Sequence, residues 1–372
     1  MLISTYNTLE RRTVYDCRVK SIMELMRHYG LTLTAQEILL ISRAITFHYD
    51  KISVPGLIQK PIPYATVSND NIEKAFFENL GIPYVEEKIG SSEEEWNYMK
   101  GLLDKGTPIM FKIDSRFLSE GYKAHEKLNL YYLSTLLLVG YEEESDSVWI
   151  VLTNTNEKER VTRLSMQEFQ EYRNTVCMPF RADYRCYYLN ENNGIKDITA
   201  KRVKQAVFDG LKDITAAMLD TGKMERLIYG AFTGSCQTGG INGMISLRQD
   251  LQDILTQCKE ADDAYKKYIK FMLIFIRNNL LFGSRTAFRS ELAKCLELCS
   301  DKFKIDELSD ISQGFYAVSG IWIELFTKLS RVAHEEGDIT KDLEDIIMTL
   351  DNIIRSEEQQ YKSLYQKLLK EK

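Results

Sequence analysis

Tyr15-Asp16-Cys17-Arg18-Val19-Lys20-Ser21-Ile22 begins a segment whose apolar residues recur at helical spacing as far as Met26. Gly30 follows as a typical stop just beyond a helix end. The pattern predicts a helix over residues 15–28, with Cys17 in its first turn. At that place the helix dipole and unpaired backbone amides favour a thiolate, and the same amides can hold an oxyanion. Acyl transfer needs both.

Two features complicate the interpretation of Cys17 as a nucleophile. Most buried cysteines are inert, so Cys17 could simply pack the first helix. Asp16 would oppose thiolate formation unless its carboxylate points away or caps the helix. Both alternatives stay open on the sequence alone.

A nucleophilic cysteine usually pairs with a histidine that takes and returns the proton. The chain has four histidines. His28 lies eleven residues further along the same predicted helix and cannot reach Cys17, since the rise is about 1.5 Å per residue. His334 falls in the helical second half. His48 and His125 fall in predicted loops and are the candidates for the base, with a surface position as the alternative.

The first half of the chain predicts an α+β fold. Capping boxes at Thr34–Glu37 and Ser165–Glu168 each predict the start of a helix, and residues 92–103 predict another. Short apolar runs predict strands at residues 109–113, 131–139, 148–152 and 161–164, the second and third forming a hairpin.

The polar segment 189–194 separates this half from a second half with helical periodicity throughout, broken only by a predicted loop at residues 233–243. We therefore predict an α+β domain over residues 1–190 and an all-α helical domain over residues 195–372. An apolar stripe on the last helix, beginning at Leu343, is expected to pack within its own domain. A homodimer contact is the alternative.

Composition excludes several classes of protein. The 48 basic and 54 acidic residues, net −6, are mixed along the chain, so no basic face for nucleic acid is expected. No leader pattern or long uncharged apolar run is present, which predicts a cytoplasmic protein without a membrane contact. The seven cysteines form no C-x-x-C pair and are expected to be thiols. Neither a metal-ligand spacing nor a dinucleotide motif is present, so no metal or cofactor is expected.

Several motifs together resemble the butirosin biosynthesis protein H family. In the first half they are residues 15–22, His28-Tyr29-Gly30-Leu31, Leu33 to Glu37, Phe47-His48-Tyr49, Gly106 to Phe111, Leu137 to Glu142 and Val148 to Leu152. In the helical half they are Gly240 to Met244, Leu280 to Arg289 and Ile311 to Leu325.

The resemblance implies a papain-like cysteine-hydrolase fold followed by a helical domain. It also implies an acyltransferase, or amide synthase, that moves an acyl or peptidyl group from a carrier-protein thioester to a small-molecule amine during natural-product biosynthesis. Cys17 matches the expected nucleophile. Families of this fold place a histidine where this chain has Ser134, and Asn154 falls near the residue that would orient it. The phosphopantetheine arm of an acyl or peptidyl carrier protein is the implied partner group, with the loop 234–243 and Arg285 or Arg289 as wall and phosphate contacts.

The missing histidine leaves three interpretations. In the first, Cys17 accepts the acyl chain and the base is His125, His48 or the amine itself, since thioester exchange is less demanding than amide hydrolysis. In the second, the chain is a non-catalytic homologue that binds a peptide or a carrier-tethered intermediate. The third is a cysteine peptidase or amidase, which depends most on the missing histidine.

Overall fold

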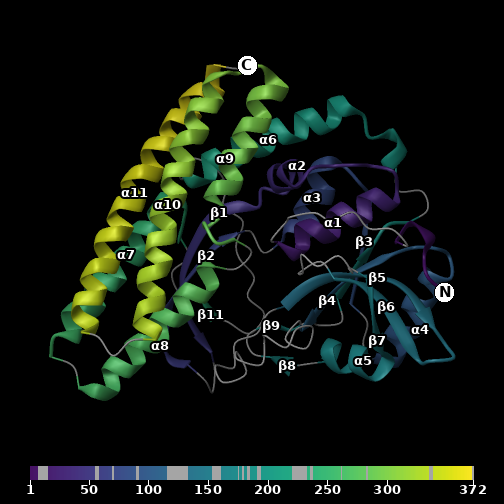
Figure 1. Cartoon of the computed structure of the whole chain (residues 1–372), viewed down its shortest axis with the longest axis horizontal. Coiled ribbons are helices and arrows are strands. Elements are labelled where there is room, and N and C mark those ends of the chain that lie inside the picture. The colour runs from purple at the N-terminus through teal and green to yellow at the C-terminus, as the bar shows by residue number, and fades with distance from the viewer. Residues whose placement is uncertain are drawn as a thin grey trace. The chain divides into compact units, whose positions relative to one another are not determined.

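The computed structural model describes residues 1–6, 16–54, 58–68, 71–88, 92–114, 133–152, 161–174, 176–177, 180–181, 185–190, 194–219, 233–234, 238–260, 262–281, 284–334 and 338–370. The chain divides into two compact units, drawn with their elements in Figure 1. The described residues of unit 1 lie within 1–38 and 72–203. Those of unit 2 lie within 39–71, 204–228 and 232–372.

Unit 1 is built on a six-stranded sheet in which every described pairing is antiparallel. The order across the sheet is β3 (Val85–Lys88), β10 (Arg185–Tyr188), β4 (Ile109–Asp114), β5 (Leu133–Glu142), β6 (Ser147–Val151) and β7 (Val161–Ser165). A tight turn joins β5 to β6, which confirms the predicted hairpin.

Helices lie against both faces of this sheet. Successive side chains of a strand point to opposite faces, so neighbouring residues of β4 contact different helices. On β4, the ring of Phe111 contacts Phe169 of α5 (Met166–Asn174), which in turn contacts Trp96 of α4 (Ser92–Leu103). The next residue, Lys112, instead contacts Glu73 of α3 (Ile72–Leu80), a helix that packs on α1 (Cys17–His28). The sheet therefore has an α4 and α5 face and an α1 and α3 face.

Unit 2 combines a hairpin with a helical bundle. The hairpin is β1 (Ile45–Val54) and β2 (Ile58–Ser68), and β1 also pairs with β11 (Thr233–Gly234) and β12 (Thr238–Gly239). Figure 1 shows α7, α8, α10 and α11 side by side, with the hairpin along them. The helices are α6 (Ala200–Met218), α7 (Gly240–Cys258), α8 (Asp263–Leu280), α9 (Arg289–Phe303), α10 (Glu307–His334) and α11 (Ile339–Lys370).

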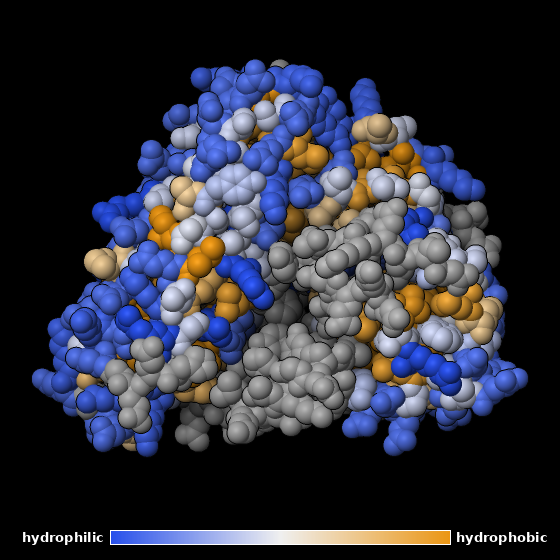
Figure 2. All heavy atoms as spheres, viewed as in Figure 1, coloured by the Kyte–Doolittle hydropathy of each residue, from blue (hydrophilic) through white to orange (hydrophobic). Residues whose placement is uncertain are grey.

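The core of unit 2 lies between the hairpin and these helices. Phe47 of β1 is fully buried with its ring 6.3 Å from that of Trp322 of α10, and Tyr64 of β2 contacts Phe275 of α8. The stripe of α11 that begins at Leu343 is buried in the same unit. Outside this core, Figure 2 shows a mainly hydrophilic surface on which apolar side chains form small groups.

The remaining short elements are η1 (Ser4–Tyr6), α2 (Ala35–Ile41), the two-stranded pair β8 (Val176–Cys177) and β9 (Phe180–Arg181), and η4 (Ile195–Asp197). Both predicted capping boxes are confirmed. The Thr34 hydroxyl accepts from the amide of Glu37 while the Glu37 carboxylate accepts from the amide of Thr34, and Ser165 and Glu168 do the same.

Most of the predicted elements are confirmed, and two segments differ. The segment around His48, predicted to be a loop in the first domain, belongs to strand β1 of the β1–β2 hairpin in unit 2. The predicted loop at 233–243 includes β11, β12 and the start of α7. β1 pairs with β11 and β12 far along the chain, so no local pattern indicates that pairing. The first half is mixed α and β and the C-terminal region is mostly helical, as predicted. Within the described part of the chain, the helices are too short or too polar to cross a bilayer.

Candidate functional site

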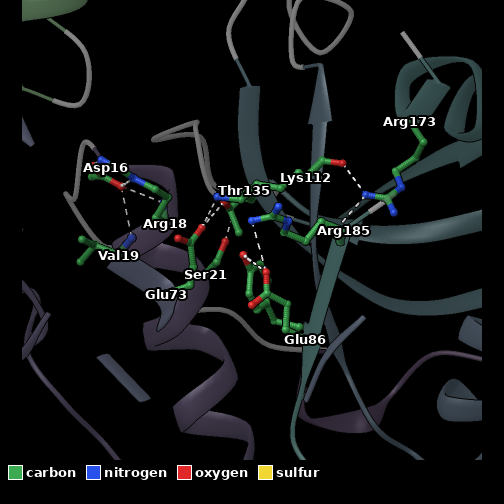
Figure 3. Close-up of polar contacts among 11 residues, drawn as sticks. Asp16, Arg18, Val19, Ser21, Glu73, Glu86, Lys112, Thr135, Arg173 and Arg185 are labelled. Carbon is green, nitrogen blue, oxygen red and sulfur yellow. Dashed lines mark hydrogen bonds and ion pairs between the residues drawn. The ribbon is translucent and has the colours of Figure 1, made fainter. Parts of the chain in front are cut away.

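Cys17 is the first residue of α1, and Asp16 is the helix N-cap. The Asp16 Oδ1 atom accepts from the backbone amides of Arg18 at 2.8 Å and Val19 at 3.3 Å (Figure 3). Its Oδ2 atom accepts from the Arg18 guanidinium at 2.6 Å. The sequence left open whether Asp16 caps the helix, and it does. These two amides therefore serve the cap and do not face a substrate oxyanion.

The thiol of Cys17 meets the backbone of Thr135 on β5. The Thr135 amide donates a hydrogen bond to the thiol, and the Thr135 carbonyl accepts from the Ser21 hydroxyl at 2.8 Å. Cys17 and Ser21 are four residues apart and thus on one face of α1.

The pKa of the Cys17 thiol is raised, first by burial and then by the Asp16 carboxylate. The side chain is only 8% exposed. Arg18, the Thr135 amide and Lys112 act in the opposite direction. The position at a helix N-terminus is thus outweighed by desolvation, and the thiol form predominates at neutral pH in the protein without substrate.

A buried pair of opposite charges lies beside this thiol. Glu73, 1% exposed, accepts at Oε1 from Lys112 Nζ at 2.5 Å and from the Thr135 hydroxyl at 2.6 Å (Figure 3). Burial acts to raise the pKa of Glu73, but Lys112 and Arg18 together hold it below its usual value. The Glu73 carboxylate is therefore charged and forms an ion pair with Lys112.

Ser134, at the position of the expected histidine, lies on the other face of the sheet. It pairs across the ladder with Ile113, whereas Thr135 pairs with Lys112. Cross-strand partners share a face, so Ser134 points with Phe111 toward α4 and α5. The β5 residue on the α1 and α3 face is Thr135. The structure thus places Cys17 beside Thr135 and not beside the Ser134 side chain.

His48 is the one proposed base among the described residues, and it lies in unit 2. It was predicted to lie in a loop, with a surface position as the alternative; it is in strand β1 and 4% exposed. That prediction was wrong because His48 alternates with Phe47 and Tyr49 in a strand buried on both faces. Burial lowers the pKa of His48 to about 4, so the ring is neutral at physiological pH. His125 and Asn154 lie outside the described residues.

Arg289 is not placed as a phosphate contact. Its guanidinium is fully buried and donates to both oxygens of Glu357, at 2.7 and 2.8 Å. A bidentate partner already satisfies it. The loop proposed as a wall for the pantetheine arm is in part a strand, and Gly243 packs against Phe47.

Sequence reasoning missed Glu73, Lys112 and Thr135. One local signal pointed to them: Lys112 is the single charge in the apolar run Ile109 to Ile113, and Glu73 is a charge in the first turn of a helix rich in phenylalanine. A lone charge in a predicted buried element implies a buried partner. Which partner it finds depends on the tertiary fold.

The site so defined is a buried thiol at a helix start, held by a strand amide and flanked by paired charges. In the part of the chain the structure describes, His, Cys, Asp and Glu side chains form no cluster able to hold a metal. Residues 16–151 match the model of the family described as butirosin biosynthesis protein H, N-terminal. This match confirms the family resemblance over those residues, which include Cys17, Glu73, Lys112 and Thr135. No curated protein matches the chain.

Proposed function

We propose that the chain is a cysteine-dependent acyltransferase that acts in natural-product biosynthesis. It moves an acyl or peptidyl group from a carrier-protein thioester to an amine. The observation that carries the proposal is the environment of Cys17, which opens α1 with the Thr135 amide on its thiol and with Arg18 and Lys112 close enough to lower its pKa. The family match over residues 16–151 supports the biosynthetic context.

The reaction divides into two exchanges at the Cys17 sulfur. The Cys17 thiol first loses its proton, and its thiolate attacks the carbonyl of the donor thioester. The carbon–sulfur bond of the donor then breaks, and the pantetheine sulfur leaves and takes up a proton. In the second exchange the amine attacks the acyl-Cys17 thioester, loses one proton and releases Cys17, which regains its thiol.

This chemistry suits a site in which Ser134 occupies the position expected for the histidine. A thiolate leaving group needs little help from an acid, whereas the amine released in peptide hydrolysis must be protonated as it leaves. We place a peptidase or amidase last for that reason. The base that accepts the Cys17 proton is His125 or the amine substrate in this proposal. The papain-like fold belongs to the same proposal, supported by a cysteine at a helix start that packs on an antiparallel sheet.

Intact-mass spectrometry after incubation with acyl-pantetheine thioesters tests the proposal. The expected result is a mass gain of one acyl group in the wild type and none in Cys17→Ala. Cys186→Ala is the matched control, because Cys186 is also a buried thiol of unit 1 whose pKa burial raises. It should acylate like the wild type. Equal acylation of Cys17→Ala and wild type would refute the role of Cys17.

A second candidate function is non-catalytic binding of a peptide or carrier-tethered intermediate. The observation in its favour is the raised pKa of Cys17, which keeps the thiol protonated. The same experiment separates the two functions. Absence of an adduct with several acyl donors, together with saturable binding of a non-hydrolysable acyl-pantetheine by calorimetry, would favour the binder.

A further inference from the structure

Thr135 contacts both helix α1 and a buried ion pair. Its amide donates to the Cys17 thiol, its carbonyl accepts from Ser21, and its hydroxyl donates to Glu73. Every polar group of this residue is thus engaged by α1 or α3. Such an arrangement fixes the residue against both helices at once.

Two charged residues from outside α1, Glu73 and Lys112, neighbour Thr135, and their contacts meet at one oxygen atom. Glu73 Oε1 accepts both from Lys112 Nζ at 2.5 Å and from the Thr135 hydroxyl at 2.6 Å. Lys112 and Thr135 are direct cross-strand partners on the same face of the sheet. Burying this pair is costly unless its geometry is well satisfied. The Glu73 side chain is nevertheless 1% exposed and the Lys112 side chain 14% exposed.

We propose that Glu73 and Lys112 are positioning residues for Cys17, which hold the Thr135 amide on the thiol and set a fixed positive charge beside it. In a cysteine–histidine pair, the imidazolium left after proton transfer stabilises the thiolate. Here the Lys112 ammonium supplies that charge. Its Nζ atom is paired with the Glu73 carboxylate at 2.5 Å, so its proposed role is to stabilise the thiolate and not to take the proton of the thiol. Any catalytic consequence rests on the proposed acyl transfer; the effect on the thiol does not.

Three charged groups, Asp16, Arg18 and Lys112, act on the thiol, and a fourth, Glu73, acts on two of them. Asp16 and Arg18 come from α1 itself, Glu73 from α3 and Lys112 from β4. Lys112 and Arg18 lower the pKa of Cys17, and Asp16 raises it. Glu73 limits the effect of Lys112 by neutralising it. Removal of the Lys112 charge should therefore move the midpoint of the Cys17 titration to higher pH, and removal of the Glu73 charge should move it to lower pH.

The test is the rate of iodoacetamide alkylation at Cys17 as a function of pH, followed by peptide mass spectrometry on the intact chain. Lys112→Gln should shift the midpoint upward and reduce the rate near neutral pH by about tenfold, the effect of one nearby charge. Lys112→Arg should restore the wild-type profile. Glu73→Gln should shift the midpoint downward. Arg185→Gln, which changes a half-exposed cation of the neighbouring strand β10, is the control and should change nothing.

Substitution of Thr135 covers the case in which the charge variants fail to fold. Thr135→Val removes the hydroxyl but keeps the shape, and should shift the profile upward as the amide loses its fixed position, whereas Thr135→Ser should not. Superimposable profiles for Lys112→Gln and wild type, or for Thr135→Val and wild type, would overturn the inference. An acyl-enzyme with unmoved profiles refutes the positioning role alone. Shifted profiles without an acyl-enzyme refute the proposed function alone.

Discussion

The Arg289 guanidinium donates from Nε to Glu357 Oε1 across 2.7 Å, and neither side chain is accessible to solvent. Trp322 Nε1 donates to the same oxygen at 2.6 Å. Removal of one member of a buried pair leaves an uncompensated charge, which costs about 3–5 kcal/mol. We therefore expect Glu357→Ala to lower the free energy of unfolding by that amount, measured by urea denaturation followed by tryptophan fluorescence.

The adjacent residue provides the control. Glu358 pairs with Lys362 at 2.6 Å on the exposed face of the same helix. Exposed pairs one turn apart contribute about 0.3–0.5 kcal/mol, so Glu358→Ala should leave the unfolding curve nearly unchanged. Equal losses in the free energy of unfolding for the two variants would show that the buried pair stabilises unit 2 no more than the exposed pair does.

Local patterns predicted those parts of the fold that local interactions determine. The helix at Cys17, the capping boxes at Thr34 and Ser165 and the strands β4 to β7 follow from spacing and side-chain chemistry within a few residues. The strands β3 and β10 were not predicted. The β1–β2 hairpin does not follow from local chemistry, because Phe47 contacts Trp322 of α10 and Tyr49 contacts Asp250 of α7, both far along the chain. Long-range packing of that kind leaves no trace in a single segment.

Of the residues in the candidate site, the sequence predicted only Cys17. Cys17 followed from the helix start, but its neighbours Glu73, Lys112 and Thr135 come from α3, β4 and β5. The residue of β5 that faces α1 depends on the strand register, because a shift of one residue along β5 exchanges Ser134 for Thr135 on that face. Counting residues back from Gly140 could not resolve that difference, since β5 carries a bulge between Leu138 and Gly140.

Asp16→Asn should make the Cys17 thiol more acidic without loss of the helix cap. Asparagine caps helices about as well as aspartate, but it carries no charge. The Asp16 carboxylate raises the pKa of Cys17, so its neutralisation should move the midpoint of alkylation to lower pH, by about one pH unit for a contact of this kind. Asp16→Ala should show a similar shift together with a loss of about 1 kcal/mol of stability from the missing cap. An unchanged midpoint in both variants would contradict the electrostatic account of the site.

His48 should make the stability of the protein depend on pH. Its pKa is about 4 in the folded chain and 6.5 as the ordinary value, so between these values only the unfolded chain binds the proton. The contribution is complete above about pH 6.5 and declines as the pH falls toward 4. At pH 5 the decline amounts to about 2 kcal/mol relative to neutral pH. His48→Gln should lose less stability than wild type between those conditions in urea denaturation. His28→Gln, a half-buried histidine of α1, should have a smaller effect. Parallel curves for His48→Gln and wild type would exclude a neutral His48.

The β1–β2 hairpin should be required for the helical half to fold. Its fully buried Phe47 packs on Trp322, Tyr64 packs on Phe275, and the Thr46 carbonyl accepts from Arg289. Each large apolar side chain contributes about 1.5–3 kcal/mol when buried, so several are lost together if the hairpin is removed. A fragment of residues 195–372 should therefore aggregate or unfold without a cooperative transition. The same fragment with residues 39–71 joined to residue 195 by a flexible linker should unfold cooperatively. A native-like transition in the fragment alone, measured by circular dichroism, would instead support a domain boundary at residues 190–195.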